Sequence, residues 1–458
     1  MSLALLPARR TPATAHQLAL AVAIALAFAD SSIVVLALPE LYVEFDTTIP
    51  RLSWVVTAYN LAVAVAIVPL VPLARRVRPG ALALVGLVLF FAASIGCALA
   101  DGLGPLVAGR TVQGLGAALL LAASLPLLIA LDGSSERAVS TWVTAGTIGV
   151  AVGPALGGLL TEVFDWRAIF AVQAPVAAAA LLAALHPRSR WARPDAAAPS
   201  GVLPVAPNIG LVLAFAALVG ALFLAVLLVV TVWDYGPLAG AGIVSALPLA
   251  ALAARPLSRR LTASLDVAGG ALLLAAGLTA LALLPSTNPV YAVLALALSG
   301  AGLGLALPPL TRASLGGEGD VTRKGVFSVG ARHLGLVVGL VAVAPVLAVA
   351  LDDGAERATQ NATAVILDAP LPLTQKLPIA LDLYREFQAA PDGEIPDLTA
   401  PFEERADEPA VQEVGDSLLE TVEAALTRSF RSSFALSALF ALLAGVTALA
   451  FRRGRLNA

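Results

Sequence analysis

The sequence predicts an all-α membrane protein with twelve transmembrane helices in two six-helix pseudo-repeats and an extra-cytoplasmic insertion before the last helix. Its 458 residues are 59% hydrophobic and only 13% charged, which is too apolar for a soluble domain. Apolar runs of about 20 residues, the length needed to cross a bilayer, recur along the chain. The charges are also segregated, since residues 351–427 hold 17 of the 31 acidic residues and four of the 28 lysines and arginines.

Twelve runs meet the length criterion, and the first is interpreted as a retained helix because Asp30 interrupts it and no small-residue cleavage site follows. They are 17–39, 53–74, 80–100, 104–131, 138–161, 167–186, 208–233, 237–257, 267–285, 289–311, 326–350 and 431–451.

Arginines and lysines gather in alternate loops, as expected for loops on the cytoplasmic side. These basic residues are Arg9, Arg10, Arg75, Arg76, Arg78, Arg188, Arg190, Arg193, Arg255, Arg259, Arg260, Arg323, Lys324, Arg452, Arg453 and Arg455. The other short loops are mainly acidic. We therefore expect a multi-pass protein of the plasma (inner) membrane with both termini cytoplasmic.

The halves carry three short matches in the same order, which favours duplication. Residues 72–76 resemble 256–260, 114–119 resemble 302–307, and 149–153 resemble 335–339, at offsets of 184, 188 and 186. Two parallel repeats place a substrate site between them near the bilayer midplane. The predicted units are an N-terminal bundle (1–187), a cytoplasmic linker (188–207), helices 7–11 (208–351), an acidic extra-cytoplasmic segment (352–430), and helix 12 with a basic tail (431–458).

Several protein classes are disfavoured by what the sequence lacks. Cys97 is the sole cysteine, so a disulfide within the chain and a cysteine metal cage are excluded. We find no nucleophile–base pair, metal-ligand spacing or phosphate loop, and therefore expect neither an enzyme nor a cofactor. No basic patch with interleaved aromatic residues indicates nucleic-acid binding.

Four ionisable residues stand out inside predicted spans, where a charge costs roughly 2.5–3.5 kcal/mol and is a functional candidate by default. Asp30 lies about nine residues, or roughly 14 Å, from the outer end of its helix. Arg110 lies at similar depth, so the two side chains are expected to meet. The pair is interpreted as a proton-coupling site, with a permanent packing ion pair and a substrate contact as alternatives.

Arg332 and His333 share one cytoplasmic turn of the eleventh span. His333 is a candidate second proton station or ligand for an anionic substrate. The alternative is that Arg332 extends to the inner interface while His333 packs or hydrogen-bonds there.

Small and polar residues complete the candidate site. Gly149, Gly153, Pro154, Gly157 and Gly158 allow close helix packing, with or without a bend at the proline. Polar and aromatic side chains inside or at the ends of spans are cavity-lining candidates. These are Tyr59, Asn60, Gln113, Gln173 and Trp233.

Five motifs resemble the drug:proton antiporter branch of the major facilitator superfamily. They are Asp30–Pro39, Trp54–Tyr59, Arg110–Ala118, Gly149–Gly158 and Asp165–Phe170. The resemblance implies the major facilitator fold and export of hydrophobic or amphipathic small molecules by proton antiport. Arg75 stands where the superfamily normally has an aspartate in its second loop, so the ion pair of that loop is not carried over.

Two other functions stay open beside export. A lipid or glycolipid flippase is also compatible with a second loop that departs from the usual pattern of the superfamily. A membrane-anchored receptor or scaffold would use segment 352–430 to bind an extra-cytoplasmic protein partner. Within that segment, 376–387 and 408–430 have helical spacing of apolar residues. The segment is a candidate lid, docking site or substrate platform, or a solvated spacer.

Overall fold

The computed structural model describes residues 14–192, 202–259, 262–316, 320–369, 371–389 and 409–449. Regular secondary structure in these residues is helical throughout, and twelve of the helices are long and apolar enough to cross a membrane. The predicted all-α class with twelve spans is therefore confirmed, and the chain is a multi-pass membrane protein.

The first half begins with a long span whose helix is continued by shorter turns. Its elements are α1 (Thr14–Val34), η1 (Val35–Ala37), α2 (Leu38–Glu44), α3 (Ile49–Leu52), α4 (Trp54–Leu73), α5 (Pro79–Ala98), α6 (Leu103–Asp132), α7 (Ser135–Val163), α8 (Trp166–Leu185) and α9 (Pro187–Arg190). Capping residues are present at some of the short connections. Gly133, at φ 77°, ends α6 in the left-handed region that glycine favours, and the Ser134 hydroxyl accepts a hydrogen bond from Arg137 N at the start of α7.

The second half repeats this order and then extends it. Its elements are α10 (Val205–Val226), η2 (Leu227–Val232), α11 (Pro237–Val244), α12 (Ala246–Ala254), η3 (Arg255–Arg259), α13 (Ala263–Ala282), α14 (Pro289–Leu315), α15 (Val321–Asp368), α16 (Leu373–Ala389), α18 (Pro409–Ser429) and α19 (Arg431–Val446). The helices expected at 376–387 and 408–430 are present in α16 and α18.

Helix α15 differs most from expectation. The span predicted at 326–350 is part of a 48-residue helix that continues to Asp368. Hydropathy locates the apolar stretch of a helix, but a helix ends only where a residue stops it. No proline follows Pro345 until Pro370, and the polar stretch between is rich in alanine, so helix propensity carries α15 past the apolar part.

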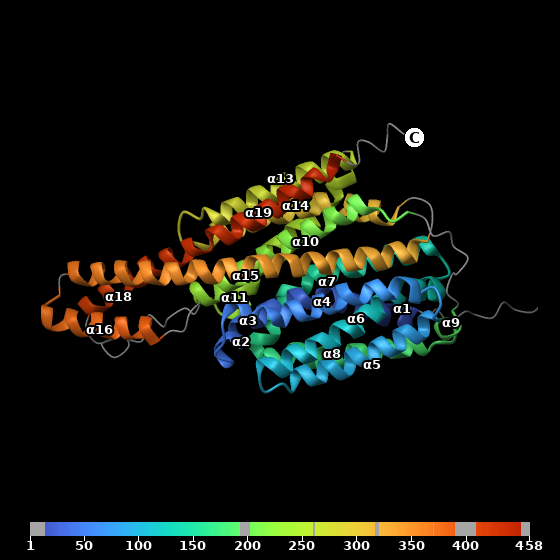
Figure 1. Cartoon of the computed structure of the whole chain (residues 1–458), viewed down its shortest axis with the longest axis horizontal. Coiled ribbons are helices and arrows are strands. Elements are labelled where there is room, and N and C mark those ends of the chain that lie inside the picture. Colours follow the sequence, from blue (N-terminus) through green and yellow to red (C-terminus); the bar gives the residue numbers. More distant parts are fainter. Residues whose placement is uncertain are drawn as a thin grey trace, which may run out of the picture.

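Two ends of the bundle serve as landmarks. The α9 end contains the connection from α6 to α7 and the connection from α14 to α15. At this end the Arg188 guanidinium donates to Leu131 O at 3.2 Å. At the α16 end, α15, α16 and α18 project beyond the other helices (Figure 1). α18 leads into α19 through Phe430, so the last span is the continuation of the projecting segment.

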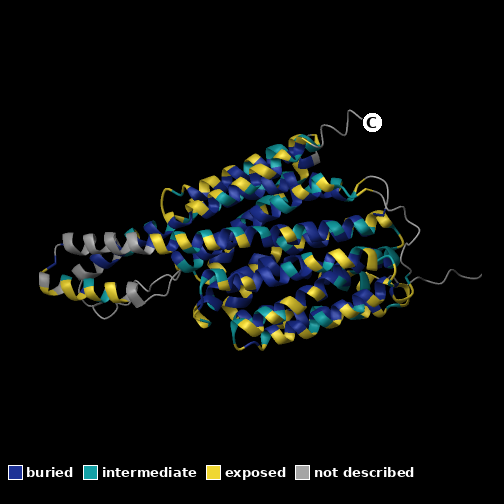
Figure 2. Ribbon diagram, viewed as in Figure 1, coloured by how far each residue is buried: buried dark blue, intermediate teal, exposed yellow. Residues whose placement is uncertain are grey.

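The distribution of polar residues is the reverse of that in a soluble protein. Large apolar side chains face outward, with Val65 62%, Val68 73% and Leu272 61% exposed, whereas Arg110 and Gln173 are fully buried. Exposed positions lie along the outer faces of the helices (Figure 2). This pattern is expected of a bundle that is surrounded by lipid.

Glycine packing supports the internal duplication and refines its register. A Cβ on Gly116 would meet Gly86 and Phe90 of α5, while a Cβ on Gly302 would meet Gly270 and Leu274 of α13. Gly116 and Gly302 therefore occupy equivalent positions at an offset of 186. The match of 114–119 with 302–307, at an offset of 188, is displaced by two residues from this packing.

Candidate functional site

A buried ion pair lies inside the first half. Arg110 Nη1 donates to Asp30 Oδ1 at 2.8 Å, Nη2 donates to Asp30 Oδ2, and both side chains are 0% exposed. Arg110 Nε also donates to Val55 O at 2.9 Å. The predicted meeting of α1 and α6 through these two charges is thus present, as a two-point contact that fixes the orientation of both groups.

Two glutamines extend this pair into a network across four helices. Gln173 Nε2 on α8 donates to Asp30 Oδ1 at 3.1 Å, and Gln113 Nε2 donates to Gln173 Oε1 at 2.6 Å. Gln113 Nε2 also lies 2.9 Å from the Ser94 hydroxyl of α5. Because each buried polar group has a partner, the network joins α1, α5, α6 and α8 without the penalty of an unpaired charge.

Asn60 links this half to the other one. His333 Nδ1 on α15 lies 2.7 Å from Asn60 Oδ1 on α4, and Asn60 Nδ2 donates to Ser31 Oγ of α1 at 2.8 Å. Since an amide oxygen only accepts, His333 Nδ1 carries the proton. Tyr59 lies next to this bridge, with its ring 4.5 Å from the Arg110 guanidinium carbon and 6.0 Å from the His333 ring.

The glycines of α7 lie at two interfaces. Cβ atoms added to Gly149, Gly153 and Gly157 would collide with the backbone or side chains of α1, and one added to Gly158 would lie 2.7 Å from Pro237 O of α11. The close-packing interpretation of these four glycines is therefore supported.

Pro154 has a consequence for the same α1–α7 contact. Having no N–H, it leaves Val150 O without its helical donor. The Ser32 hydroxyl of α1, which donates to Ala29 O at 2.8 Å, lies 3.5 Å from that oxygen.

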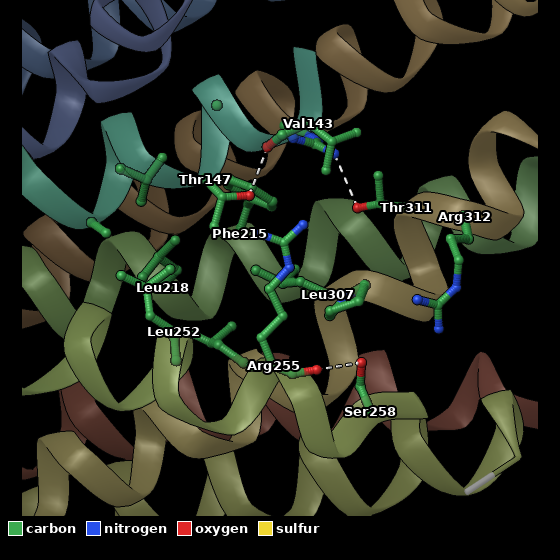
Figure 3. Close-up of a pocket in the computed structure, with 18 of the residues that line it drawn as sticks. Val143, Thr147, Phe215, Leu218, Leu252, Arg255, Ser258, Leu307, Thr311 and Arg312 are labelled. Carbon is green, nitrogen blue, oxygen red and sulfur yellow. Dashed lines mark hydrogen bonds between the residues drawn. The ribbon is translucent and has the colours of Figure 1, made fainter. Parts of the chain in front are cut away.

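A cavity of about 450 Å³ lies between the two halves. Its walls come from α7 of the first half and from α10, α12, η3, α14 and α15 of the second (Figure 3). Arg255, Gly316 and Val321 also line it, and all three belong to the α9 end. The cavity therefore extends to the α9 end of the bundle, between α7 and α14.

The halves are in contact at the opposite end. Leu238 N of α11 donates to Glu162 Oε2 of α7 at 3.3 Å, next to the close approach of Gly158 to Pro237. The cavity thus lies between α7 and the second half on the α9 side, and α7 meets α11 on the α16 side. Elsewhere the halves are packed at the α9 end too, because Gly330 of α15 lies against Ile67 of α4.

Arg332 lines the cavity. One of its guanidinium nitrogens donates to Thr311 Oγ1 at 3.0 Å, and its Cζ lies 5.7 Å from the ring centre of Phe28, 5.8 Å from Trp142 and 5.6 Å from Phe215. The Arg332 side chain is therefore directed among these rings. The contact of His333 with Asn60 agrees with the interpretation in which His333 packs or hydrogen-bonds.

The other predicted candidates lie elsewhere. None of Tyr59, Asn60, Gln113, Gln173 and Trp233 is among the residues that line this cavity. Tyr59, Asn60 and the two glutamines are buried in the networks above. Trp233 Nε1 donates to the Thr427 hydroxyl of α18 at 2.9 Å, near the α16 end.

Sequence reasoning did not single out Phe28, Trp142, Phe215 or Thr311. A tryptophan inside an apolar span, near its start, was the one signal in the sequence, since Trp142 needs a partner for its N–H and finds the Ser124 hydroxyl at 2.9 Å. Within the described residues, no group of three or more metal-ligating side chains could hold a metal ion.

Comparison with known proteins shows the family to which this chain belongs. The profile of the Major Facilitator Superfamily matches residues 20–315. The chain is 38% identical over 161 residues to the multidrug resistance protein Stp of Mycobacterium tuberculosis (34% of this chain, 30% of Stp). It is 35% identical over 164 residues to the drug efflux pump JefA of that organism (35% and 32%), and 34% identical over 173 residues to the methylenomycin A resistance protein of Streptomyces coelicolor (37% and 36%).

The matched region thus spans about a third of the length of each of these relatives. Solved structures resemble the whole fold at low identity. A bacterial homologue of the lysosomal transporter Spinster, described as inward-facing and unoccupied, aligns with a TM-score of 0.64 at 15% identity, covering 96% of this chain and 98% of that one. A D-xylose–proton symporter aligns with a TM-score of 0.58 at 16% identity, covering 72% and 89%. From its profile match and its twelve-helix fold, the chain belongs to the Major Facilitator Superfamily.

Proposed function

We propose that this protein is a secondary active transporter that exports hydrophobic or amphipathic small molecules from the cytoplasm across the plasma membrane by proton antiport. The observation that carries the proposal is the cavity between the two halves, which is lined mostly by apolar side chains and reaches one end of the bundle. Drug efflux by its relative JefA, and the naming of its relative Stp as a multidrug resistance protein, support the same class of cargo.

The basic loops support an orientation with the α9 end in the cytoplasm. Arg75, Arg76 and Arg78 connect α4 to α5 at that end, whereas Asp101 and Asp165 occupy connections at the other. In this orientation the cavity faces the cytoplasm. Rocking the halves about their interface, so that the contact of Gly158 with α11 opens, is the proposed alternating-access step.

Asp30 is the proposed proton-binding residue. Its carboxylate is held by Arg110 and Gln173 in this conformation, so the ion pair must separate before a proton can bind. Protonation would remove the charge that attracts Arg110 and would thereby change how α1 and α6 pack. Proton binding and helix position are linked in this scheme because the same two oxygens serve both.

The test uses purified protein in liposomes, inserted with its cytoplasmic face outward. The lumen of these liposomes can be made acidic. We expect an acidic lumen to drive accumulation of a fluorescent amphiphile, and Asp30→Asn to abolish this drive while slower downhill movement remains. Asp101→Asn is the matched control, because Asp101 is exposed in a connection between spans. Accumulation that ignores the pH gradient, and that is equal in the wild type and in Asp30→Asn, would show that the protein is not a proton antiporter.

A further inference from the structure

The cavity carries charge of one sign only. Three arginines line it, Arg255, Arg312 and Arg332, and no aspartate or glutamate is among the described residues of its wall. The side chain of Arg255 extends from η3 into the cavity, and Arg312 lies at one side of it (Figure 3). A cationic cargo would be repelled here, because the apolar wall lowers the local dielectric and strengthens interactions between charges.

Arg332 is the cavity arginine with a buried side-chain nitrogen that has no hydrogen-bond partner among the described residues. Its guanidinium has five N–H donors. Thr311 accepts one hydrogen bond, the three aromatic faces supply cation–π contact, and Nε is buried without a partner among the described residues. Arg332 forms no ion pair with any residue that the structure describes.

Arg110 shows how a fully buried arginine of this protein is supplied with hydrogen-bond acceptors in this conformation. That guanidinium binds both oxygens of Asp30, donates to Val55 O at 2.9 Å, and contacts the Gln113 side-chain oxygen. Arg332 has the same chemical need and lacks a carboxylate to meet it. The difference is that Arg332 borders open space, where a ligand can enter.

The residues around Arg332 could bind a ligand that has an aromatic or aliphatic part next to an anionic group. Trp142 is 2% exposed and fixed by its hydrogen bond to Ser124. Beyond the arginines, the cavity wall is apolar along α10, α12 and α14, with Leu218, Leu252 and Leu307 among its residues (Figure 3). A cavity of about 450 Å³ is within the size range of sites for one small molecule.

The geometry points to an amphipathic anion as the cargo class. A carboxylate or phosphate would bind the Arg332 guanidinium beside Thr311, and an apolar body would lie along α10, α12 and α14. This inference rests on the proposed function and narrows it, since export of amphiphiles in general makes no choice of charge.

The test compares three dansyl probes that share one alkyl chain and end in a carboxylate, a neutral amide or a trimethylammonium group. Binding to purified protein in nanodiscs of zwitterionic lipid is measured by dansyl fluorescence. We expect the carboxylate probe to bind roughly tenfold or more tightly than the other two probes. This is the gain in affinity that one charge-assisted hydrogen bond contributes. Arg332→Gln should remove this preference and Arg332→Lys should keep part of it, while Arg137→Gln, outside the cavity, should change nothing.

Two further measurements are made. One distinguishes a free anion from a lipid headgroup, and the other distinguishes failure of the anion proposal from failure of the export proposal. Adding an anionic phospholipid to the nanodiscs should leave carboxylate binding within twofold; full displacement would assign the site to a lipid headgroup and overturn the cargo class. Equal binding of all three probes, or tighter binding of trimethylammonium, also overturns it. Transport of these probes in liposomes is scored independently, so an anion site without transport refutes export alone, and transport of the cation alone refutes the anion class alone.

If Arg332→Gln does not fold, Thr311→Val supplies the second readout. This variant keeps the charge and removes the hydroxyl that accepts from Arg332, so the carboxylate preference should fall by a few-fold. Unchanged carboxylate affinity in both Arg332→Lys and Thr311→Val would contradict anion binding at this position.

Discussion

Replacing Asp30 with asparagine tests how strongly the ion pair holds the first half together. The wild-type carboxylate offers one oxygen to each terminal nitrogen of Arg110. Asparagine keeps one of these oxygens and turns the other into an NH₂ group that faces a donor. Arg110 is 0% exposed, so water cannot replace the lost acceptor.

The expected cost follows from that burial. Removing one partner of a fully buried pair destabilises a protein by about 3–5 kcal/mol, because the remaining charge is uncompensated. Converting Arg110 to glutamine in the same chain removes that charge. The double variant Asp30→Asn/Arg110→Gln should therefore be less destabilised than the sum of the two single changes.

Denaturant unfolding in detergent, followed by tryptophan fluorescence, measures the change. Trp142 and Trp166 are both buried and report loss of packing. Asp266→Asn is the matched control, because both carboxylate oxygens of Asp266 are buried without a hydrogen-bond partner among the described residues. We expect that change to be neutral or stabilising. An Asp30→Asn protein as stable as the wild type, or an Asp266→Asn protein equally destabilised, would refute the reasoning.

Three further predictions concern packing and the bridge between the halves. Gly149→Ala should cost about 1–3 kcal/mol of unfolding free energy because its Cβ would collide with the α1 backbone, whereas Gly96→Ala, with open space at that position, should cost nothing measurable in the same assay. Trp233→Phe should lose about 1 kcal/mol by leaving the α18 hydroxyl unpaired, and protease resistance of the projecting segment should fall with it. His333→Leu should break the hydrogen bond to Asn60 and shift the spacing of spin labels placed on α4 and α15, and an unchanged distance distribution would mean that the bridge does not hold the halves.

Part of the site was accessible from sequence because position along a helix sets depth in a bundle. Asp30 and Arg110 were expected at similar depth from the rise of their helices, and they do form an ion pair. The same reasoning cannot say which way a side chain points around its helix. Tyr59, Gln113 and Trp233 were therefore expected at a cavity, and each instead packs in another contact.

The neighbours of Arg332 could not be predicted from the sequence. Arg332 was recognisable as a charge in an apolar span, but its partners Phe28, Trp142 and Phe215 come from three other helices. No periodicity within α15 carries information about those neighbours. Spans in lipid are apolar on nearly every face, so the amphipathic stripe that marks a buried face in soluble helices is absent.

Sequence alone determined the twelve spans, the all-helical class and the segregation of basic and acidic loops. Each of these depends on the length, apolarity or charge of one local segment, because a span must satisfy its own backbone hydrogen bonds wherever it lies in the bilayer. Tertiary structure decided which helix faces meet, and that the described wall of the space between the halves contains three arginines and no aspartate or glutamate. Those features arise from contacts between segments far apart in the chain, and such contacts depend on packing that no single segment encodes.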